Sequence, residues 1–232
     1  MSFIPTFSPE ELAGMIDQTL LKPFVGEEEM RAFCMESAKY CFKMVAVNCA
    51  TTEYCSRVLK DSGVHVGAAV SFPFGQSTIE SKVFETKNAI DNGADEIDYV
   101  INIFELKNRN YPYLQREMSE IVDLCRQYGK ISKVIFENCY LTEEEKKKMC
   151  EIALAVGPDF IKTSTGFGTS GASVEDVRLM KQMAGDKIKV KAAGGIRSLQ
   201  DALDMIEAGA ERIGTSSGTR IVDDYKKLKG RT

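Results

Sequence analysis

At Asp159-Phe160-Ile161-Lys162-Thr163-Ser164-Thr165-Gly166-Phe167, a lysine interrupts an apolar, strand-like run that opens into a glycine turn. If the run is a β-strand, Phe160, Lys162 and Ser164 share one face. Burial of that face disfavours the ammonium and lowers the lysine pKa, and a neutral amine is a nucleophile toward carbonyls. The alternative is a lysine at a strand end whose ammonium reaches solvent. This stretch alone leaves both interpretations open.

A second lysine lies in a similar setting, at Val190-Lys191-Ala192-Ala193-Gly194-Gly195-Ile196-Arg197. Two lysines that face one cavity repel each other, so each lowers the pKa of the other. Bringing a lysine pKa from about 10.4 to near neutrality takes about 4 kcal/mol of differential interaction, which burial and a neighbouring ammonium can supply. The two stretches together predict a Schiff-base lysine and a second lysine that activates it.

Strand-like apolar runs alternate with longer helical patterns along the chain. The helical segments begin with capping signals such as Thr142-Glu143-Glu144-Glu145 and end at glycines that recur 24 to 36 residues apart. The strand-like runs lack a regular polar alternation, as expected of parallel strands covered by helices. Eight repeats predict an α/β protein with a closed (β/α)8 TIM barrel rather than an open doubly wound sheet. The predicted strands are residues 15–21, 43–48, 64–71, 96–102, 132–138, 159–164, 187–193 and 211–215.

The chain as a whole fits a single domain, residues 1–232. Ser8-Pro9-Glu10-Glu11 is a capping-box sequence, so we expect a short extra N-terminal helix that ends near Gly14. No linker or low-complexity tract marks a second domain. With 44% hydrophobic and 28% charged residues the composition is that of a soluble protein. We see neither a signal peptide nor an apolar run of about 20 residues, and therefore expect a cytoplasmic protein with no membrane partner.

Composition also argues against several function classes. The net charge is −4 and no stretch clusters Lys and Arg with aromatic residues, so we expect no nucleic-acid partner. His65 is the only histidine, which excludes a zinc site with several imidazoles and leaves a Ser-His-Asp hydrolase with one unsuitable base. We expect His65 to be structural. The seven cysteines form no C-x-x-C pair and are expected to be buried thiols without disulfides.

Three further motifs accompany the two lysine stretches. In chain order they are Ile16-Asp17-Gln18-Thr19-Leu20-Leu21-Lys22-Pro23, Gly93-Ala94-Asp95-Glu96-Ile97-Asp98-Tyr99-Val100-Ile101-Asn102 and Arg212-Ile213-Gly214-Thr215-Ser216-Ser217-Gly218. Over essentially its whole length, the chain resembles the deoxyribose-phosphate aldolase (DeoC) family of class I aldolases. The resemblance implies reversible cleavage of a sugar phosphate, 2-deoxy-D-ribose 5-phosphate, to acetaldehyde and D-glyceraldehyde 3-phosphate. It implies no cofactor and no metal, and a homodimer is possible on the same basis.

Active sites of (β/α)8 barrels lie at the carboxyl ends of the strands, and phosphate commonly binds after strands seven and eight. The resemblance gives Lys162 the role of nucleophile, with Lys191 and Asp98 as its catalytic partners. In the predicted strand Asp98 faces inward, where pairing with Lys191 would stabilise its charge and supply a proton relay. Without the resemblance, Asp98 fits a structural ion pair equally well. The expected substrate-binding residues are Thr165 at the hydroxyls and Gly166, Gly194, Gly195, Ser216 and Ser217 at the phosphate.

Other charged residues are weaker candidates. Lys189 lies two residues before Lys191 and is expected at the lower rim of the barrel. Glu137, Lys22 and Lys43 are interpreted as rim or surface charges.

The sequence departs from the family pattern at Gln18, where histidine is frequent, at Ala46, where some members have cysteine, and at Asn138, where threonine is usual. We expect all three at the mouth of the site, where they bear on substrate preference rather than reaction type. The tail, residues 223–232, lacks the final tyrosine of some members. Two alternatives therefore stay open: another lysine-dependent aldolase with a different aldehyde pair, or a non-catalytic sugar-phosphate-binding barrel.

Overall fold

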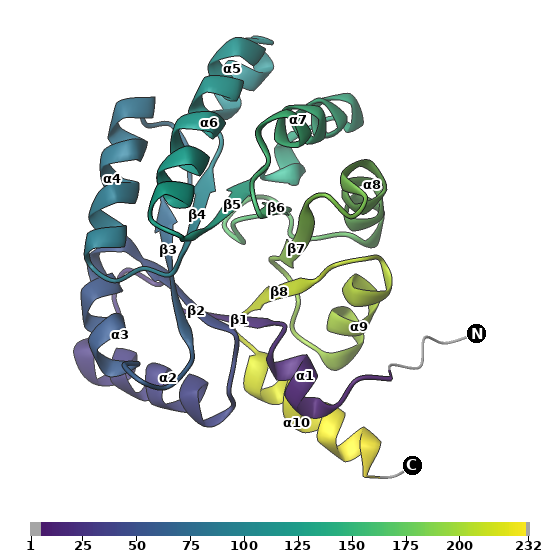
Figure 1. The fold of residues 1–232 in the computed structure, drawn as a ribbon. Coiled ribbons are helices and arrows are strands. Elements are labelled where there is room, and N and C mark those ends of the chain that lie inside the picture. The colour runs from purple at the N-terminus through teal and green to yellow at the C-terminus, as the bar shows by residue number, and fades with distance from the viewer. Residues whose placement is uncertain (1–5, 231–232) are drawn as a thin grey trace.

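Eight parallel strands form a closed barrel in the computed structural model, which describes residues 6–230 (Figure 1). The strands follow one another in chain order, and β1 pairs with β8 to close the ring. The predicted (β/α)8 architecture and all eight predicted strands are confirmed, with ends that move by up to three residues. The strands are β1 (Ile16–Thr19), β2 (Met44–Asn48), β3 (His65–Val70), β4 (Glu96–Val100), β5 (Ile131–Ile135), β6 (Phe160–Lys162), β7 (Lys189–Ala193) and β8 (Arg212–Thr215).

Helices form a ring around the barrel, as expected of right-handed crossovers between parallel strands (Figure 1). Several begin at capping side chains, among them the predicted Thr142: the Thr142 and Ser173 side chains each accept a backbone N–H of the first turn that follows. The helices are α1 (Pro9–Ala13), α2 (Glu27–Lys39), α3 (Thr52–Val58), α4 (Ile79–Asp91), α5 (Ile103–Lys107), α6 (Tyr111–Gln127), α7 (Glu143–Val156), α8 (Val174–Ala184), α9 (Leu199–Glu207) and α10 (Gly218–Lys229), with 3-10 turns η1 (Cys49–Thr51) and η2 (Asn138–Tyr140).

The short N-terminal helix is confirmed, and it packs beside the last helix of the chain (Figure 1). Ser8 and Glu11 form the predicted capping box, with the Ser8 N–H donating to Glu11 at 2.6 Å. The Phe7 and Tyr225 rings lie 5.4 Å apart, and the Tyr225 hydroxyl donates to the Phe7 carbonyl at 2.7 Å. These contacts join the two ends of the barrel sequence.

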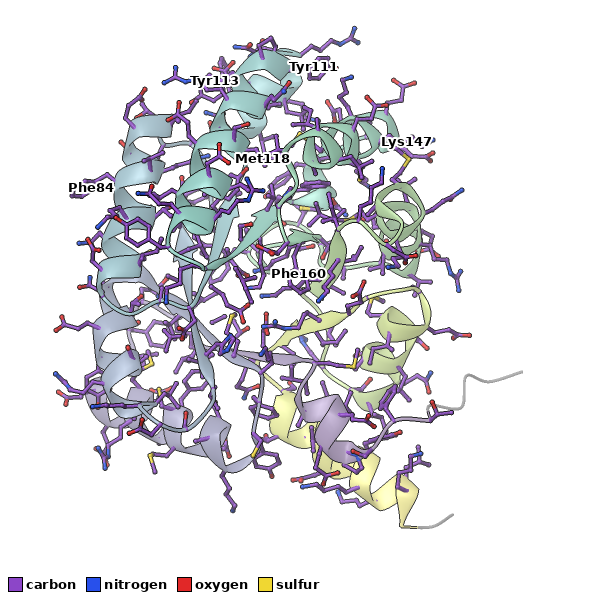
Figure 2. The ribbon with its side chains drawn as sticks, in the orientation of Figure 1. Phe84, Tyr111, Tyr113, Met118, Lys147 and Phe160 are labelled. Carbon is purple, nitrogen blue, oxygen red and sulfur yellow. The ribbon has the colours of Figure 1, made fainter. Side chains whose placement is uncertain are left out.

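The hydrophobic core lies mainly between the barrel and its helices. Outward-facing strand residues such as Ile97, Tyr99 and Ile161 are fully buried there. Figure 2 shows Phe160 near the middle of the barrel and Phe84 on the outside of α4, where it is 75% exposed. Polar side chains such as Glu96, Asp98 and Lys133 occupy much of the barrel interior instead. Within residues 6–230, no helix is long and apolar enough to cross a membrane.

A buried ion pair between α4 and α6 fixes the carboxyl end of β4. Lys82 Nζ lies 2.6 Å from Glu117 Oε1 and donates to the Val100 carbonyl at 2.7 Å, while Glu117 accepts the Asn102 N–H at 3.1 Å. The strand therefore ends at Val100, and Asn102 caps α5 by accepting the Glu105 N–H at 3.3 Å. The predicted strand, residues 96–102, extends two residues too far.

All seven cysteines are free thiols. Four are buried, but Cys41 is exposed and Cys49 and Cys139 are half-buried, so the prediction of uniformly buried thiols is wrong at these three positions.

Candidate active site

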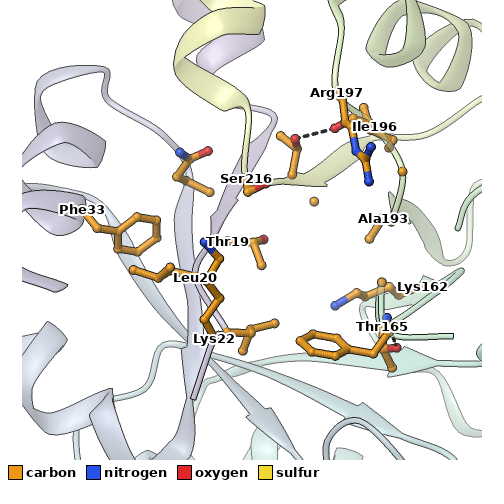
Figure 3. A pocket seen from close by; sticks show the side chains of 18 of the residues that line it. Thr19, Leu20, Lys22, Phe33, Lys162, Thr165, Ala193, Ile196, Arg197 and Ser216 are labelled. Atoms are coloured by element: carbon orange, nitrogen blue, oxygen red, sulfur yellow. Dashed lines mark hydrogen bonds between the residues drawn. The ribbon is translucent and has the colours of Figure 1, made fainter. Parts of the chain in front are cut away.

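Lys162 ends β6 and lines a cavity of about 750 Å³ at the carboxyl end of the barrel. The strand is short, and hydrogen bonds from Phe136 N–H to the Lys162 carbonyl (3.0 Å) and from Thr163 N–H to the Lys191 carbonyl (3.1 Å) hold the lysine between β5 and β7. Lys162 is only 5% exposed. Figure 3 shows its amine projecting into the cavity, with Thr165 nearby and Ser216 and Arg197 across the opening. The interpretation of Lys162 as a lysine free in solvent is therefore excluded.

Three lysines surround the carboxylate of Asp98. Lys162 Nζ and Lys191 Nζ lie 2.8 Å and 2.7 Å from the same oxygen, Oδ2, and Lys133 Nζ lies 2.6 Å from Oδ1. The predicted contact between Asp98 and Lys191 is present, and Asp98 also joins Lys191 to Lys162. Burial opposes a charge on Asp98, but the ammonium groups of Lys133, Lys162 and Lys191 outweigh it and hold the Asp98 pKa well below its usual value.

A second set of charges lies directly beneath this carboxylate. Asp17 Oδ2 is 2.5 Å from Lys191 Nζ, and the other Asp17 oxygen accepts from Arg212 Nε at 2.7 Å. Glu96 accepts from Arg212 at 3.1 Å and lies 2.6 Å from Lys133 Nζ. His65 Nδ1 hydrogen-bonds Glu96 at 2.7 Å, which is the structural role expected of this histidine.

The buried cluster carries one more positive than negative group when all of its lysines and Arg212 are protonated. Its cations are Lys133, Lys162, Lys191 and Arg212, and its anions are Asp17, Glu96 and Asp98. Loss of one proton balances the charges, which stabilises a cluster removed from water. Of these amines, Lys162 is the one that lines the cavity.

The pKa of Lys162 is lowered to about 8. Burial is the largest cause, and the positive charges of Lys191 and Lys133 add to it against the attraction of Asp98. About a tenth of the Lys162 side chains are then neutral at pH 7. The amine nucleophile predicted from the sequence thus fits the electrostatics, although burial contributes more than the neighbouring lysine does.

The sequence analysis missed four members of this cluster: Lys133, Glu96, Asp17 and Arg212. Lys133 stands directly opposite Asp98 in the register of β4 and β5. The available signal was a lysine inside the apolar run Lys133-Val134-Ile135-Phe136, the same signal that singled out Lys162.

Most of the predicted binding residues border the cavity. Thr165, Gly166, Gly194, Gly195 and Ser216 line it, and the two consecutive glycines have left-handed backbone (φ 85° and 79°) that exposes their peptide groups. Ser217 is not among the lining residues, because it caps α10 and donates its N–H to the Thr215 hydroxyl at 2.9 Å.

The start of α9, which follows β7, is not an open helix N-terminus. The Arg197 and Ser198 N–H groups both donate to the Asp201 carboxylate at 2.9 Å, so a side chain of the helix already occupies its first turn. The peptide groups still available for an anion after β7 are those nearer to Gly194 and Gly195.

The weaker candidates fall into three places. Lys189 is exposed at the lower rim, with its Nζ 5.7 Å from the centre of the Phe160 ring, as predicted. Lys22 lines the cavity mouth and Lys43 is half-buried outside it. Glu137 was interpreted as a rim or surface charge, and this is wrong: it is 2% exposed, because the Thr165 hydroxyl and N–H both donate to it.

The three departures from the family pattern do not all lie at the mouth. Gln18 does line the cavity, and its Oε1 accepts the Gly218 N–H at 3.0 Å, which ties β1 to the start of α10. Ala46 and Asn138 are buried and do not line it, so their predicted position is wrong. Asn138 turns away because its Nδ2 contacts Met180 Sδ at 3.3 Å.

Within residues 6–230, no group of three or more His, Cys, Asp or Glu side chains is arranged to hold a metal ion.

Comparisons with known proteins show which proteins this chain is similar to. A deoxyribose-phosphate aldolase of Lactobacillus acidophilus is 55% identical, covering 97% of this chain and 94% of that protein. One from Bacteroides thetaiotaomicron is 54% identical, covering 97% and 95%. The structure of a tetrameric deoxyribose phosphate aldolase from Aeropyrum pernix superimposes with a TM-score of 0.89 at 34% identity, covering 95% of this chain and 93% of that one. The model of the DeoC/LacD family aldolases matches residues 13–223, and the chain belongs to that family.

Proposed function

We propose that this protein is a metal-independent class I aldolase that reversibly cleaves 2-deoxy-D-ribose 5-phosphate to acetaldehyde and D-glyceraldehyde 3-phosphate. The observation that carries the proposal is the setting of Lys162: a buried amine with a pKa lowered to about 8, open to a cavity of about 750 Å³. The names of the relatives at 54–55% identity support the choice of substrate. A barrel that only binds sugar phosphates has no need of a buried Lys162, Lys191 and Asp98.

Lys162 supplies the nucleophile in this proposal. Its neutral amine adds to the C1 aldehyde and loses water to give a protonated imine, which attracts electrons from the neighbouring carbons. The bond between C2 and C3 then breaks, because the acetaldehyde fragment holds C1 and C2. The electron pair of that bond forms an enamine on C2, and the C3 hydroxyl loses its proton to become the carbonyl of glyceraldehyde 3-phosphate. Protonation of C2 and hydrolysis of the imine release acetaldehyde and restore the lysine.

Asp98 and Lys191 move the protons in these steps, together with water. Their contact at 2.7 Å, and the contact of the same Asp98 oxygen with Lys162, give a continuous path from the imine nitrogen into the buried cluster. Lys133 holds the other oxygen of Asp98 and so keeps the carboxylate in place.

The substrate phosphate binds at the opposite side of the cavity, on the peptide groups of Gly194 and Gly195 and the side chain of Ser216, with Gly166 beside them. Thr165 contacts a substrate hydroxyl between the imine and the phosphate. Ser217 is left out of this binding set, because it does not line the cavity.

Borohydride reduction tests the assignment. Incubation with 2-deoxyribose 5-phosphate and borohydride is expected to fix a two-carbon or five-carbon adduct on Lys162, located by peptide mass spectrometry, and Lys162→Ala is expected to fold and form none. An adduct on Lys191 or Lys133 would refute the choice of nucleophile. A Lys162 adduct with other aldehydes, but no cleavage of this sugar phosphate, would support the lysine aldolase with a different aldehyde pair.

We further propose a cytoplasmic homodimer, on the family resemblance. Light scattering of the purified protein is expected to give twice the chain mass of 25.7 kDa. A mass of four chains would replace this proposal with a tetramer, the state described for the Aeropyrum pernix aldolase.

A further inference from the structure

Glu137 is a buried charged residue that the proposed chemistry does not use. It follows β5 with a left-handed backbone (φ 58°, ψ 62°), a strained conformation for a residue other than glycine. Hydrogen bonds on either side hold it there: Phe136 N–H donates to the Lys162 carbonyl and Asn138 N–H to the Thr163 carbonyl, at 3.0 Å and 2.9 Å. This backbone directs the Glu137 side chain to the loop that follows Lys162.

The Glu137 carboxylate accepts both hydrogen-bond donors of Thr165, its N–H and its hydroxyl. Its Oε1 accepts the Thr165 N–H at 3.2 Å, and its Oε2 accepts from the Thr165 hydroxyl. The Phe167 N–H in turn donates to the Thr165 hydroxyl oxygen at 3.0 Å. A hydroxyl has one proton and two lone pairs. The Thr165 proton is donated to Glu137 and one lone pair is used by Phe167, so one lone pair is left for a ligand.

Close packing keeps this arrangement fixed. A Cβ at Gly168 would lie 2.5 Å from Cys139 Sγ and 3.2 Å from Glu137 Cδ, so the loop rests directly on the carboxylate. Glu137 borders a separate cavity of about 230 Å³, whereas Thr165 borders both cavities. Glu137 therefore reaches the substrate cavity through Thr165.

We propose that Glu137 is a positioning residue that makes the Thr165 hydroxyl a hydrogen-bond acceptor, and that the site thereby selects substrates with a hydroxyl on C4. This inference rests on the proposed function. The C3 hydroxyl forms from the reacting carbonyl, which leaves the C4 hydroxyl as the other donor between the imine and the phosphate. The chain from the substrate hydroxyl through Thr165 to the Glu137 carboxylate strengthens each of its hydrogen bonds.

The test runs the reaction in the direction of synthesis, with acetaldehyde and either of two phosphorylated acceptor aldehydes. One is D-glyceraldehyde 3-phosphate, and the other carries fluorine in place of its 2-hydroxyl, the group that becomes the C4 hydroxyl. Fluorine cannot donate a hydrogen bond. In Glu137→Gln the amide donates to Thr165 and frees its proton to point into the cavity. The ratio of kcat/KM for the hydroxyl over the fluoro acceptor is expected to fall about tenfold from wild type, the size of one hydrogen bond. The intrinsic reactivity of the fluoro aldehyde cancels in this comparison.

Variants of Thr165 give an independent arm of the experiment. Thr165→Val is expected to lose the preference for the hydroxyl acceptor, Thr165→Ser to keep it, and the Glu137→Gln/Thr165→Val double variant to lose no more than Thr165→Val alone. Borohydride trapping of acetaldehyde on Lys162 checks that each variant has a formed site.

Two results would overturn the inference: a wild-type ratio in Glu137→Gln or Thr165→Val, or an equal loss with both acceptors, which is the outcome of a merely structural Glu137. If Glu137→Gln does not fold, the two Thr165 variants still decide whether this hydroxyl acts as the acceptor. Absence of any trapped acetaldehyde in the wild-type protein would instead refute the proposed function.

Discussion

Replacing Lys191 by methionine is expected to raise the pKa of Lys162. The two amines bind the same Asp98 oxygen at 2.8 Å and 2.7 Å, so these distances place their nitrogens at most about 5.5 Å apart. Two unit charges at that separation repel by about 3 kcal/mol at an effective dielectric constant of about 20. Removal of one charge then raises the pKa of the other by about two, and the neutral fraction of Lys162 at pH 7 falls about a hundredfold. Asp98, relieved of one partner, attracts the Lys162 proton more strongly, which acts in the same direction.

The assay is the pH dependence of acetaldehyde trapping on Lys162 by borohydride. Only the neutral amine reacts, so the rate rises with pH through the Lys162 pKa, which is about 8 in the wild type. In Lys191→Met this rise is expected about two pH units higher. The midpoint of this rise does not depend on proton transfer by Lys191, because a loss of proton transfer lowers the rate at every pH. Lys189→Met is the matched control, because Lys189 lies on the same strand but is exposed at the lower rim. A folded Lys191→Met variant with the wild-type midpoint would refute the electrostatic reasoning.

Asp98→Asn is expected to move the rise in trapping rate to lower pH, because the Asp98 charge favours protonated Lys162. It is also expected to lower kcat more than it weakens substrate binding. An unchanged midpoint in the trapping assay would contradict this. Gly195→Val is expected to raise KM for 2-deoxyribose 5-phosphate at least tenfold and to spare the rate with unphosphorylated deoxyribose, since a side chain there blocks the peptide group that the phosphate approaches. Equal losses with both sugars would make the glycine turn a scaffold element. Lys82→Met is expected to lower the free energy of unfolding, measured by urea denaturation, by about 3 kcal/mol, because it leaves Glu117 buried without its lysine partner. Lys87→Met, which removes an exposed ion pair on the same helix, is expected to leave the midpoint of urea denaturation unchanged.

The barrel and the lysine pair could be predicted from the sequence because local geometry determines both. Capping residues and recurring glycines set the number of strands, and alternation within a strand determines which side chains face inward. Lys162 and Lys191 stand opposite each other in the register of β6 and β7. Predicting that the two lysines lie together needed only the assumption that neighbouring strands are parallel.

The residues that were missed or misplaced depend on features beyond a single strand. Lys133 carried the local signal of a lysine in an apolar run, but its role as a partner of Asp98 follows from the register between β4 and β5. Glu137 lies past the end of β5, where a left-handed residue breaks the alternation that would have been needed to orient it. Ser217 lies in a glycine-rich motif, but it is used to begin a helix.

The ion pair between Asp17 and Arg212 has a consequence for synthesis of the chain. The two residues are 195 positions apart, so at typical rates of about 5–20 residues per second Arg212 is made roughly 10–40 s after Asp17. Until β7 and β8 are made, Asp17 lacks both Lys191 and Arg212, Glu96 lacks Arg212, and Asp98 lacks Lys191. A growing chain therefore cannot bury these carboxylates at full stability, and the charged interior of the barrel is completed only when its last strands leave the ribosome.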